Sequence, residues 1–433
     1  MDQYLTYSIQ LRNLSKDLFV LLTRMTYHSA RIYNSSLYVI KKHYEKTKKH
    51  LNYNSFYHDC KSFINYKILP SAVAQQTLRI LDRNYRSFFS LIKKAKKNKE
   101  FHFPEPPHFL PKNSKFLIVF PKSGFRTENG KLFLAVSNLL KKDQPIQRIE
   151  LDFPTNINPK SVKEIRILPK CNGKFFNLQI VYKKEAEKQN DLDKNSVLGI
   201  DLGLDNLATC IDIKNGKAFI MDGKWVKSIN RFYNKNRARL QSIKDKQKTK
   251  GETEQMFRIT RKRNNQIRDF MHKTAKRIIT YCLENKIGYI VIGHNKGWKQ
   301  NINLGKKSNQ NFVQVPFGKL MEYLKYRCER YGIEYHEIGE SHTSKCSFLD
   351  YEEIKHHDKY AGKRVKRGIF RTNKGILVNA DCNGAANIAA RSMSLRKDSE
   401  KVTIIEREWL EAALKRPSRI RLFCSLNKNQ QSS

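Results

Sequence analysis

One acidic residue, Asp201, lies within an otherwise apolar segment, Val197–Leu202, with Gly199 and Gly203 on either side of it. The segment predicts a buried strand, and a carboxylate on such a strand is unfavourable by several kcal/mol unless it is paired or binds a cation. The two glycines leave space for another backbone or a phosphate to approach closely. The chain must therefore fold so that a partner compensates Asp201, unless this carboxylate only caps a nearby turn.

A second acidic residue, Asp381, lies where a predicted strand meets a helix of small residues, in the segment Val378–Asn387. The small residues allow this helix to lie close against a neighbouring element. The alternative interpretation is that Asp381 is an ordinary N-cap aspartate, a residue that helix starts favour. Asp201 and Asp381 are therefore the two positions at which the local pattern indicates chemistry.

The C-terminal part of the chain alternates predicted strands with predicted helices, which indicates an α/β domain with a mixed sheet. It follows a highly polar segment, 186–195, which we interpret as a linker. The predicted elements are strands at 197–202 and 207–213, a basic helical stretch over 228–285 that breaks near Gly251, a strand at 289–293, a helix at 317–331, a strand at 333–338 and a helix that begins at 383.

The N-terminal part begins with an alternating segment, 4–11, that predicts a strand, and helical apolar spacing follows from Ser15 onward. The second predicted helix begins at Ser71 and ends before the proline-rich segment 101–112. Short predicted strands then follow up to residue 182. We interpret this part as a small β-barrel that is interrupted by an inserted helical domain.

The chain carries 84 Lys and Arg residues against 40 Asp and Glu among its 433 residues, a formal net charge of +44. Such a chain repels itself and predicts a polyanionic partner, of which nucleic acid is the first candidate, ahead of a membrane surface or ribosomal RNA. The charge argues against an ordinary metabolic enzyme. Hydrophobic residues (39%) and aromatic residues (11%) are frequent enough for hydrophobic cores, which argues against disorder, and the length predicts two or three domains.

The eight cysteines are scattered and form no C-x-x-C pair, which predicts a reduced, intracellular protein without a disulfide framework. The N-terminal residues alternate and include Asp2, so no signal peptide is expected, and no apolar run of about 18 residues predicts a membrane helix. We therefore expect a cytoplasmic protein without a membrane partner, associated with the nucleoid if it is prokaryotic.

The order of these segments resembles the RuvC-like nuclease domain of the TnpB family, transposon-encoded relatives of the type V CRISPR effectors and of the eukaryotic Fanzor proteins. That order is the Asp-x-Gly strand, the long basic helices, the apolar strand, the segment Thr343–Cys346 and the helix that includes Asn379–Asn387. Residues 71–89 and 232–240 also resemble TnpB segments. The resemblance extends from about residue 4 to residue 392.

The resemblance implies a multidomain protein, in which a RuvC-like nuclease domain with the RNase H fold follows a wedge-like β-barrel with an inserted helical recognition domain. The implied limits are 1–14 and 100–185 for the β-barrel, 15–99 for the recognition domain, 186–195 for the linker, 196–340 and 376–412 for the nuclease domain, 341–375 for a degenerate zinc-ribbon or target-loading insert, and 413–433 for a basic tail.

The implied activity is that of an RNA-guided DNA endonuclease. A guide RNA made from the transposon end selects double-stranded DNA by base pairing, beside a short motif that the protein reads. Three carboxylates, Asp201, Glu340 and Asp381, hold two Mg²⁺ or Mn²⁺ ions for the hydrolysis of phosphodiester bonds. One or two copies of the protein assemble on the RNA.

One of these carboxylates departs from the usual family position. A glutamate usually ends the apolar strand where this chain has Gly293. Glu340 lies just beyond the next strand, 333–338, which an RNase H-like sheet places parallel to the first at about 4.8 Å. Some TnpB subgroups and Fanzor relatives have a relocated glutamate of this kind, and Glu340 resembles it. The alternatives are that Glu340 is a surface carboxylate at a strand end, or that Glu337 or His294 is the ligand.

The zinc ribbon of the family is also incomplete in this chain. Cys346 matches the first cysteine of the family pattern, but Leu349 stands where the second is usual, and Cys382 alone follows nearby. A structural zinc site needs four thiolate or imidazole ligands. His356 and His357 bring the number to four, but adjacent histidines point in different directions. We therefore do not expect zinc.

Basic residues on the predicted helices and in the insert are candidates for contacts to nucleic acid, and the alternative for each helix is a solvated face. They are Arg79, Arg83, Arg86, Lys93, Arg237, Arg239, Arg261, Arg263, Lys299, Lys363, Arg364 and Arg367. Trp298 is a candidate for stacking on a base, and the alternative is a core tryptophan.

Two other functions stay open at this point. A nuclease-inactive, RNA-guided DNA-binding repressor on the same fold agrees with Gly293, whereas the presence of Asp201 and Asp381 argues for a nuclease. A transposase that joins DNA ends itself is the third hypothesis, which the resemblance to an accessory nuclease disfavours.

Overall fold

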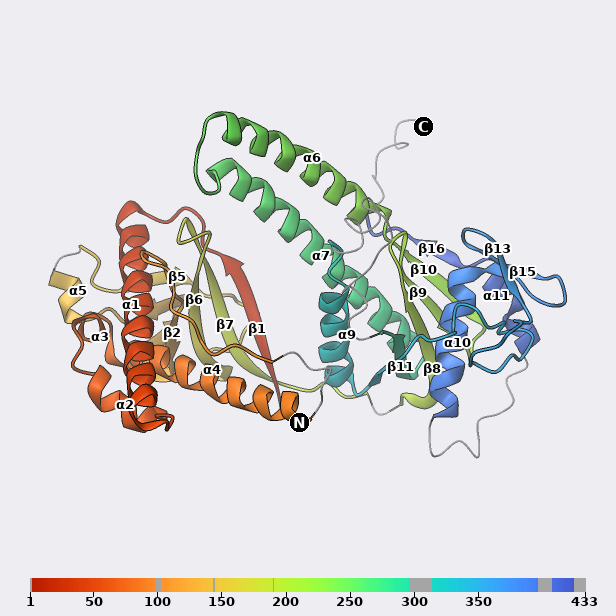
Figure 1. Cartoon of the computed structure of the whole chain (residues 1–433), viewed down its shortest axis with the longest axis horizontal. Helices are drawn as coiled ribbons and strands as arrows, with labels where there is room; N and C mark the ends of the chain where they lie inside the picture. Colours follow the sequence, from red (N-terminus) through yellow and green to blue (C-terminus); the bar gives the residue numbers. More distant parts are fainter. Residues whose placement is uncertain are drawn as a thin grey trace. The chain divides into compact units, whose positions relative to one another are not determined.

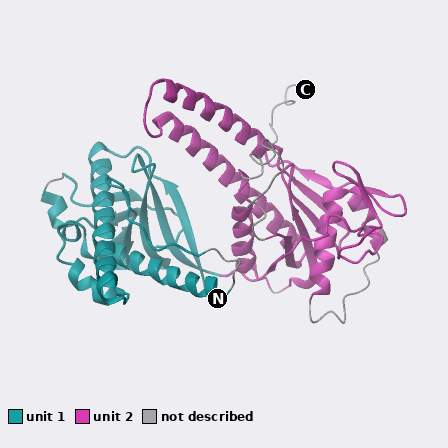
Figure 2. Cartoon of the chain, in the orientation of Figure 1, with its two compact units in different colours: residues 1–185 teal, residues 186–433 magenta. Residues whose placement is uncertain are grey.

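The computed structural model of the chain describes residues 2–97, 103–142, 145–189, 191–295, 314–395 and 407–423. The chain divides into two compact units, Met1–Glu185 and Ala186–Ser433 (Figure 2). The first unit has one hydrophobic core, and the second has a core on each face of its main sheet. Within the described residues, no helix is both long and apolar enough to span a bilayer.

The strands of the first unit form two antiparallel sheets (Figure 1). The four-stranded sheet has the order β1-β7-β6-β2, with β1 at Asp2–Gln10, β2 at Ile118–Pro121, β6 at Val162–Lys170 and β7 at Phe175–Glu185. The three-stranded sheet has the order β3-β4-β5, with β3 at Phe125–Glu128, β4 at Lys131–Leu134 and β5 at Ile149–Asp152. The predicted barrel is thus seen as two sheets, because the chain turns at η1, Lys122–Gly124, between β2 and β3.

The main helices of the first unit lie between β1 and β2 in the sequence, although β1 pairs with β7. They are α1 (Lys16–Thr47), α2 (Tyr53–Cys60), α3 (Ile64–Ile68) and α4 (Ser71–Lys97), and the short α5 (Asn138–Lys142) follows β4. The hydroxyl of Ser15 caps α1 by accepting a hydrogen bond from the amide of Leu18. The apolar faces of α1 and α4 share one core with β2, β6 and β7, so the inserted helices cover the sheet.

The second unit is built on a six-stranded sheet with the order β12-β11-β8-β9-β10-β16. Its strands are β8 (Asp193–Leu202), β9 (Asn206–Asp212), β10 (Lys217–Asp222), β11 (Ile287–Gly293), β12 (Glu334–Ile338) and β16 (Ser418–Ile420). β8, β9 and β10 form an antiparallel meander, and β11 and β12 run parallel to β8. This order and these directions are those of an RNase H-like sheet, and they agree with the predicted mixed sheet.

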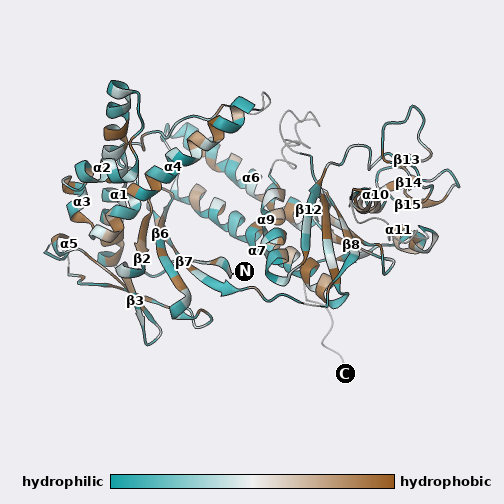
Figure 3. Cartoon of the chain, turned by 90° about the horizontal axis from the view of Figure 1, so that it is seen from below, coloured by the Kyte–Doolittle hydropathy of each residue, from teal (hydrophilic) through white to brown (hydrophobic). Residues whose placement is uncertain are grey.

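Helices cover both faces of this sheet. They are α6 (Lys224–Lys246), α7 (Glu254–Glu284), α9 (Phe317–Tyr331), α10 (Ala380–Ser394) and α11 (Glu411–Lys415), with a 3₁₀ turn, η4, at Arg407–Leu410. Leu198 and Ile200 face α7 and α9 in one core, whereas Val197 faces α10 in the other. The pair α6–α7 breaks around Gly251, as predicted, and many residues of its ribbon are coloured hydrophilic in Figure 3.

Two segments differ from their predicted character. Residues 193–195, predicted as the end of a linker, belong to β8, and the amide of Asp193 donates to the carbonyl of Lys286 at 2.8 Å. The segment from 413 to 423, predicted as part of a basic tail, forms the end of α11 and β16, which pairs in parallel with β10. The basic composition of this segment suggested a tail, but Leu414 is buried and Ile420 packs on the sheet.

The insert between β12 and α10 folds into a three-stranded sheet of its own. Its strands are β13 (Lys363–Lys366), β14 (Ile369–Arg371) and β15 (Leu377–Asn379). β15 leads directly into α10, so the hairpin β13–β14 lies beside the start of this helix.

Candidate active site

The helix α10 packs against β8 at very short distance. A Cβ atom at Gly199 would lie 2.4 Å from the carbonyl oxygen of Ala385 and 2.7 Å from the Cβ of Ala389. Gly199 therefore admits the backbone of α10, and the small residues of this helix serve the close contact that the sequence predicts. The approach that the first glycine allows is thus that of a helix rather than a phosphate.

Asp201 faces α10, because it follows Val197 and Gly199 at steps of two residues along β8. Its carboxylate lies against the first turn of α10, where a Cβ at Gly384 would be 3.1 Å from Asp201 Oδ2. Burial raises the pKa of Asp201 well above its ordinary value, and the negative charges of Asp381 and Glu340 raise it further. The three carboxyl groups are therefore electrostatic neighbours.

Asp381 is not the N-cap of α10. The side chain of Asn379 performs that role by accepting hydrogen bonds from the amides of Asp381 (3.0 Å) and Cys382 (3.1 Å). The carboxylate of Asp381 instead accepts from Asn206 Nδ2 at 2.6 Å and from Arg364 Nη2 at 3.3 Å. Because Asn379 caps the helix, Asp381 is free to face the site.

Glu340 occupies the space that Gly293 leaves. β12 runs parallel to β11, with Ile338 opposite Gly293, and the register of β11 on β8, continued by one residue, brings Gly293 beside Asp201. A Cβ at Gly293 would lie 2.7 Å from Glu340 Cγ and 2.8 Å from Glu340 Oε1. The side chain of Glu340 thus lies where a side chain at position 293 would begin.

The backbone around Glu340 is held from both sides. Its amide donates to Asn295 Oδ1 at 3.0 Å, and its carbonyl accepts from the hydroxyl of Thr343 at 2.9 Å. The guanidinium of Arg391, on α10, donates to the carbonyls of Gly339 (3.3 Å) and Ser341 (3.0 Å). These contacts fix the backbone of residues 339–341, and thereby the point from which the Glu340 side chain starts.

The two alternative ligands lie apart from this cluster. Ile338 packs in the core that includes α10. Because side chains alternate along a strand, the preceding residue, Glu337, points to the opposite face of β12. It accepts a hydrogen bond from the Tyr335 hydroxyl at 3.0 Å, and its other oxygen lies 3.7 Å from His294 Nδ1. Glu337 and His294 therefore contact each other rather than Asp201.

The donor set suits a hard divalent cation, because it consists of carboxylate oxygens. Glu340 Oε1 is buried and has no hydrogen-bond partner among the described residues, and burial raises the pKa of Glu340. In the part of the chain that the structure describes, however, no three His, Cys, Asp or Glu side chains are gathered closely enough to hold a metal ion. Arg364 instead compensates part of the negative charge of these carboxylates. It forms an ion pair with Asp381, and its positive charge opposes the rise in the pKa of Asp201 that burial causes.

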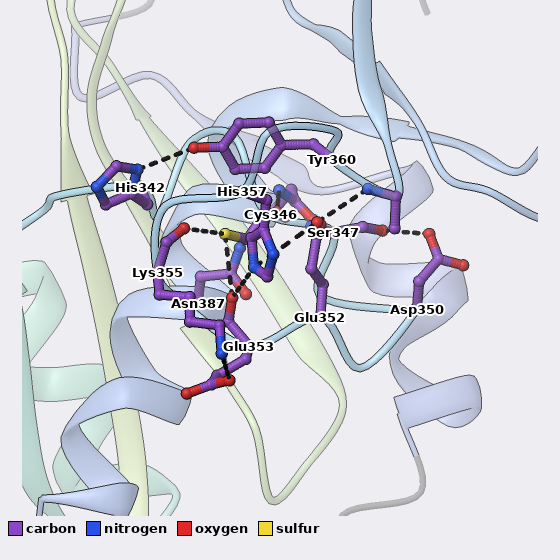
Figure 4. A network of polar contacts seen from close by, with 12 residues as sticks. His342, Cys346, Ser347, Asp350, Glu352, Glu353, Lys355, His357, Tyr360 and Asn387 are labelled. Atoms are coloured by element: carbon purple, nitrogen blue, oxygen red, sulfur yellow. Dashed lines mark hydrogen bonds and ion pairs between the residues drawn. The ribbon is translucent and has the colours of Figure 1, made fainter.

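The cysteines that might have bound zinc take other partners. The thiol of Cys346 donates to the backbone carbonyls of Glu353 (3.4 Å) and Lys355 (3.7 Å), as Figure 4 shows. Cys382 is buried in α10, where burial and then the charges of Asp381 and Asp201 raise the pKa of its thiol. These two thiols therefore belong to different surroundings.

Polar contacts hold the insert together (Figure 4). Glu352 accepts from the amides of Ser347 (2.7 Å) and Ala361 (2.8 Å). Asp350 accepts from the hydroxyl of Ser347 (2.6 Å) and the amide of Asn373 (2.7 Å). Carboxylates that bind backbone amides thus tie together the segments that a zinc ion joins in a zinc ribbon.

Two asparagines of α10 hold the start of the insert and were missed as functional positions in the sequence. Asn387 Nδ2 donates to the carbonyls of Thr343 and Cys346, each at 2.8 Å. Asn383 Nδ2 donates to the same Cys346 carbonyl at 2.8 Å, and Asn383 Oδ1 accepts from the amide of Phe348 at 3.0 Å. Their spacing of four residues, which places both on one helix face, was the available signal.

The candidate nucleic-acid contacts differ in their surroundings. Several extend from helix faces into solvent or lie in the exposed hairpin: Arg83, Lys93, Arg239 and Lys363. Others are exposed or half-buried but have partners within their own unit: Arg79 over the Tyr53 ring, Arg86 with Asp82, Arg237 with Glu252, Arg364 with Asp381 and Arg367 with Asp205. Arg261 is not free of interactions either. Lys299 and Trp298 lie outside the described residues.

Arg263 has an internal role. It donates to Asn230 Oδ1 at 2.8 Å, to Asn264 Oδ1 at 2.9 Å and to the carbonyl of Gln314 at 2.9 Å. Burial lowers the pKa of its guanidinium. The side chain therefore joins α6, α7 and the residues before α9, whatever else it contacts.

Two family models match parts of the chain. The model described as a probable transposase, OrfB_IS605, matches residues 179–299, and the model of the Cas12f1-like TNB domain matches residues 317–388. A curated relative, the TnpB-like protein ORF457 of Acidianus two-tailed virus, is 23% identical over 380 residues, with 82% of this chain and 76% of that protein covered. Together these matches support a TnpB-family protein.

The fold of the chain is also seen in a solved structure. Cas12f1, in a cryo-EM structure of a Cas12f1-sgRNA-target DNA complex, superposes with a TM-score of 0.60 and 16% identity, and 87% of this chain and 83% of Cas12f1 are covered. Asp201 and Gly293 lie within the first family match, and Glu340 and Asp381 lie within the second. The three carboxylates thus come from the two parts of the chain that the family models match, and the multidomain fold is consistent with a RuvC-containing architecture.

Proposed function

We propose that this TnpB-family protein is an RNA-guided DNA endonuclease with a single RuvC-like site. The family is one of transposon-associated RNA-guided nucleases, and Cas12f1 of the similar structure is bound to an sgRNA and target DNA. The net charge of +44 supports partners that present many phosphates. The guide is an RNA from the transposon end, the target is double-stranded DNA beside a short motif, and the protein acts in the cytoplasm.

The observation that carries this proposal is the position of Glu340 in the space left by Gly293, on the same face of the sheet as Asp201 and Asp381. Asp201, Glu340 and Asp381 would hold Mg²⁺ or Mn²⁺. When bound, such ions supply activation of a water molecule and stabilisation of the leaving oxygen in phosphodiester hydrolysis. Glu340 Oε1, which has no hydrogen-bond partner among the described residues, is available to such a cation.

Arg364 supports the same proposal, because its guanidinium could bind a phosphate of the DNA substrate. Its side chain is 51% exposed, yet it reaches Asp381 from the β13–β14 hairpin. A guanidinium binds carboxylate and phosphate by the same hydrogen-bond geometry. Arg364 would therefore compensate Asp381 in the free protein and exchange this partner for a DNA phosphate when a cation takes the carboxylate.

The test is to purify the protein with its RNA, sequence that RNA, and incubate the complex and Mg²⁺ with a plasmid library that carries the matching target beside random sequence. We expect cleavage of those members that carry one short adjacent motif. Asp201→Ala, prepared with the same RNA, is the control for contaminating nucleases. Binding without cleavage at any motif would overturn the nuclease proposal.

A nuclease-inactive, RNA-guided repressor is the second candidate function. The observation that favours it is the ion pair of Arg364 with Asp381, together with the lack, among described residues, of three gathered metal ligands. The same plasmid library separates the two functions. A repressor retains the motif-dependent binding in the library, with and without Mg²⁺, but leaves every plasmid intact.

A further inference from the structure

The C-terminal strand β16 brings an arginine to the edge of the six-stranded sheet. β16 pairs in parallel with β10, with Arg419 opposite Ile220, although almost 200 residues separate the two strands in the sequence (Figure 1). Arg419 Nη1 donates to Asp222 Oδ2 at 3.2 Å. Asp222 is 7% exposed, so this carboxylate needs a cation, and it fixes the guanidinium at the end of β10.

The second donor of the same guanidinium reaches towards the site. Arg419 Nη2 donates to Asn206 Oδ1 at 2.8 Å, at the start of β9. Asn206 Nδ2 in turn donates to Asp381 Oδ2 at 2.6 Å. Asp222, Arg419, Asn206 and Asp381 therefore form one continuous chain of polar contacts from the edge strand to the carboxylate.

The chemistry of this chain settles the orientation of the Asn206 amide. Arginine has donors only, so it must face the amide oxygen, and the ionised carboxylate of Asp381 accepts only, so it must face the amide nitrogen. Asp381 and Arg419 thus select the same orientation of the amide, and Arg419 anchors its oxygen end. In this orientation Asn206 Nδ2 contacts Oδ2 of Asp381, while Oδ1 of Asp381 accepts from Arg364.

We propose that Asn206 and Arg419 are positioning residues of the nuclease site, through which the C-terminal strand aligns Asp381. The inference rests on the proposed function, because alignment of Asp381 matters for a cation and a substrate bound there. Neither residue contacts Asp201 or Glu340 in the interactions of the described residues. Their loss should therefore impair the site without removing a ligand.

A matched control is present on the same strand end. Arg421 also lies near Asp222, with Nε 3.7 Å from Asp222 Oδ2, but its contact is with Asp222 rather than Asn206. Arg419→Met and Arg421→Met each remove one positive charge and one ion pair with the same carboxylate. A purely structural role of the strand, or a general loss of charge, would affect both variants alike.

The experiment compares the RNA-bound wild-type complex with Arg419→Met, Arg421→Met, Asn206→Ala and the double variant Asn206→Ala/Arg419→Met. Target affinity, the single-turnover cleavage rate and the melting temperature are measured for each. We expect cleavage to be roughly 10- to 100-fold slower for Arg419→Met and for Asn206→Ala, with target affinity and melting temperature close to those of Arg421→Met. The double variant should be no slower than Asn206→Ala, because Arg419 acts through Asn206.

A second readout does not depend on cleavage. Mn²⁺ binding to each RNA-bound complex is followed by electron paramagnetic resonance, with Asp381→Asn as the blank for ions held by RNA. We expect weaker Mn²⁺ binding for Asn206→Ala and Arg419→Met and unchanged binding for Arg421→Met. Equal effects of the two arginine variants, or additive losses in the double variant, would overturn the inference. An inactive wild-type complex would instead count against the proposed nuclease, so the two failures are distinguishable.

Discussion

The two edges of the six-stranded sheet contribute to the carboxylate cluster in different ways. At the β12 edge, Glu340 enters the cluster directly and fills the space beside Gly293. At the β16 edge, Arg419 stays at a distance and is connected to Asp381 by hydrogen bonds through Asn206. In our proposal, a metal ligand at one edge and an orienting cation at the other thus meet at α10, which packs on β8 in the middle of the sheet.

In our proposal, the two edges differ in how a residue can reach the cluster. A carboxylate can be supplied by the strand next to β11, because neighbouring parallel strands lie about 4.8 Å apart, a distance that one glutamate side chain spans. The contact from the β16 edge spans a larger distance, because the Asn206 amide accepts from Arg419 with its oxygen and donates to Asp381 with its nitrogen. Both edges depend on Asp201 and Asp381 at the centre.

The largest expected effect therefore lies at the centre. Asp201→Ala and Asp381→Ala should each lower the cleavage rate more than about 100-fold, the upper range for losing a residue that only supports a metal ligand. Affinity of the RNA-bound complex for target DNA should stay within a few-fold of wild type. Gel-shift and cleavage assays on the same preparations check this. A variant that cleaves at the wild-type rate would remove that aspartate from the site.

A smaller effect is expected from moving the carboxylate back from the β12 edge to β11. Glu340→Ala should be nearly inactive, whereas Gly293→Glu/Glu340→Ala should regain at least about ten-fold in cleavage rate, since it returns the carboxylate to the neighbouring strand. The closest obstacle is Ile388 Cδ1, 2.4 Å from a Cβ at position 293. Adding Ile388→Val removes this atom and tests crowding. No gain in either combination would contradict the equivalence of the two positions.

The smallest expected effect is on stability rather than on the cleavage rate. It tests the close packing of α10 on β8, on which the contributions of both edges depend. Gly199→Ala places a Cβ 2.4 Å from the carbonyl of Ala385, so it should lower the free energy of unfolding by about 1–3 kcal/mol. Gly318→Ala is the matched control, because nothing lies within 4 Å of its added Cβ. We expect this control to be neutral or slightly stabilising. Thermal melting measures both, and equal melting temperatures would show that α10 is not closely held.

The β12 edge could be predicted from the sequence, and the β16 edge could not. Glu340 follows a recognisable strand whose partner in the sheet was inferable from the order of elements, and Gly293 marked the missing carboxylate. β16 has only three residues, Ser418–Ile420, in a segment whose basic composition resembles a tail. Its pairing with β10 is a contact between distant segments that no local pattern encodes.

The residues that hold the ligands were also hidden from sequence reasoning. Asn206, Asn295 and Arg391 act by hydrogen bonds to backbone carbonyls, amides or Asp381, and such roles depend on three-dimensional position. The aspartates were visible because a charge on an apolar strand or before a small-residue helix is unusual in itself. A neutral amide at the end of a strand carries no comparable signal.

The measurement that tests the central claim most directly is the cleavage rate of Glu340→Gln beside that of Glu337→Gln, each bound to the same RNA. The two variants lose one negative charge each, on the same strand end, but on opposite faces of β12. If Glu340 is the relocated ligand, Glu340→Gln should cleave target DNA about 100-fold more slowly than wild type while Glu337→Gln cleaves normally. Wild-type cleavage by Glu340→Gln, or equal losses in both variants, would contradict the account.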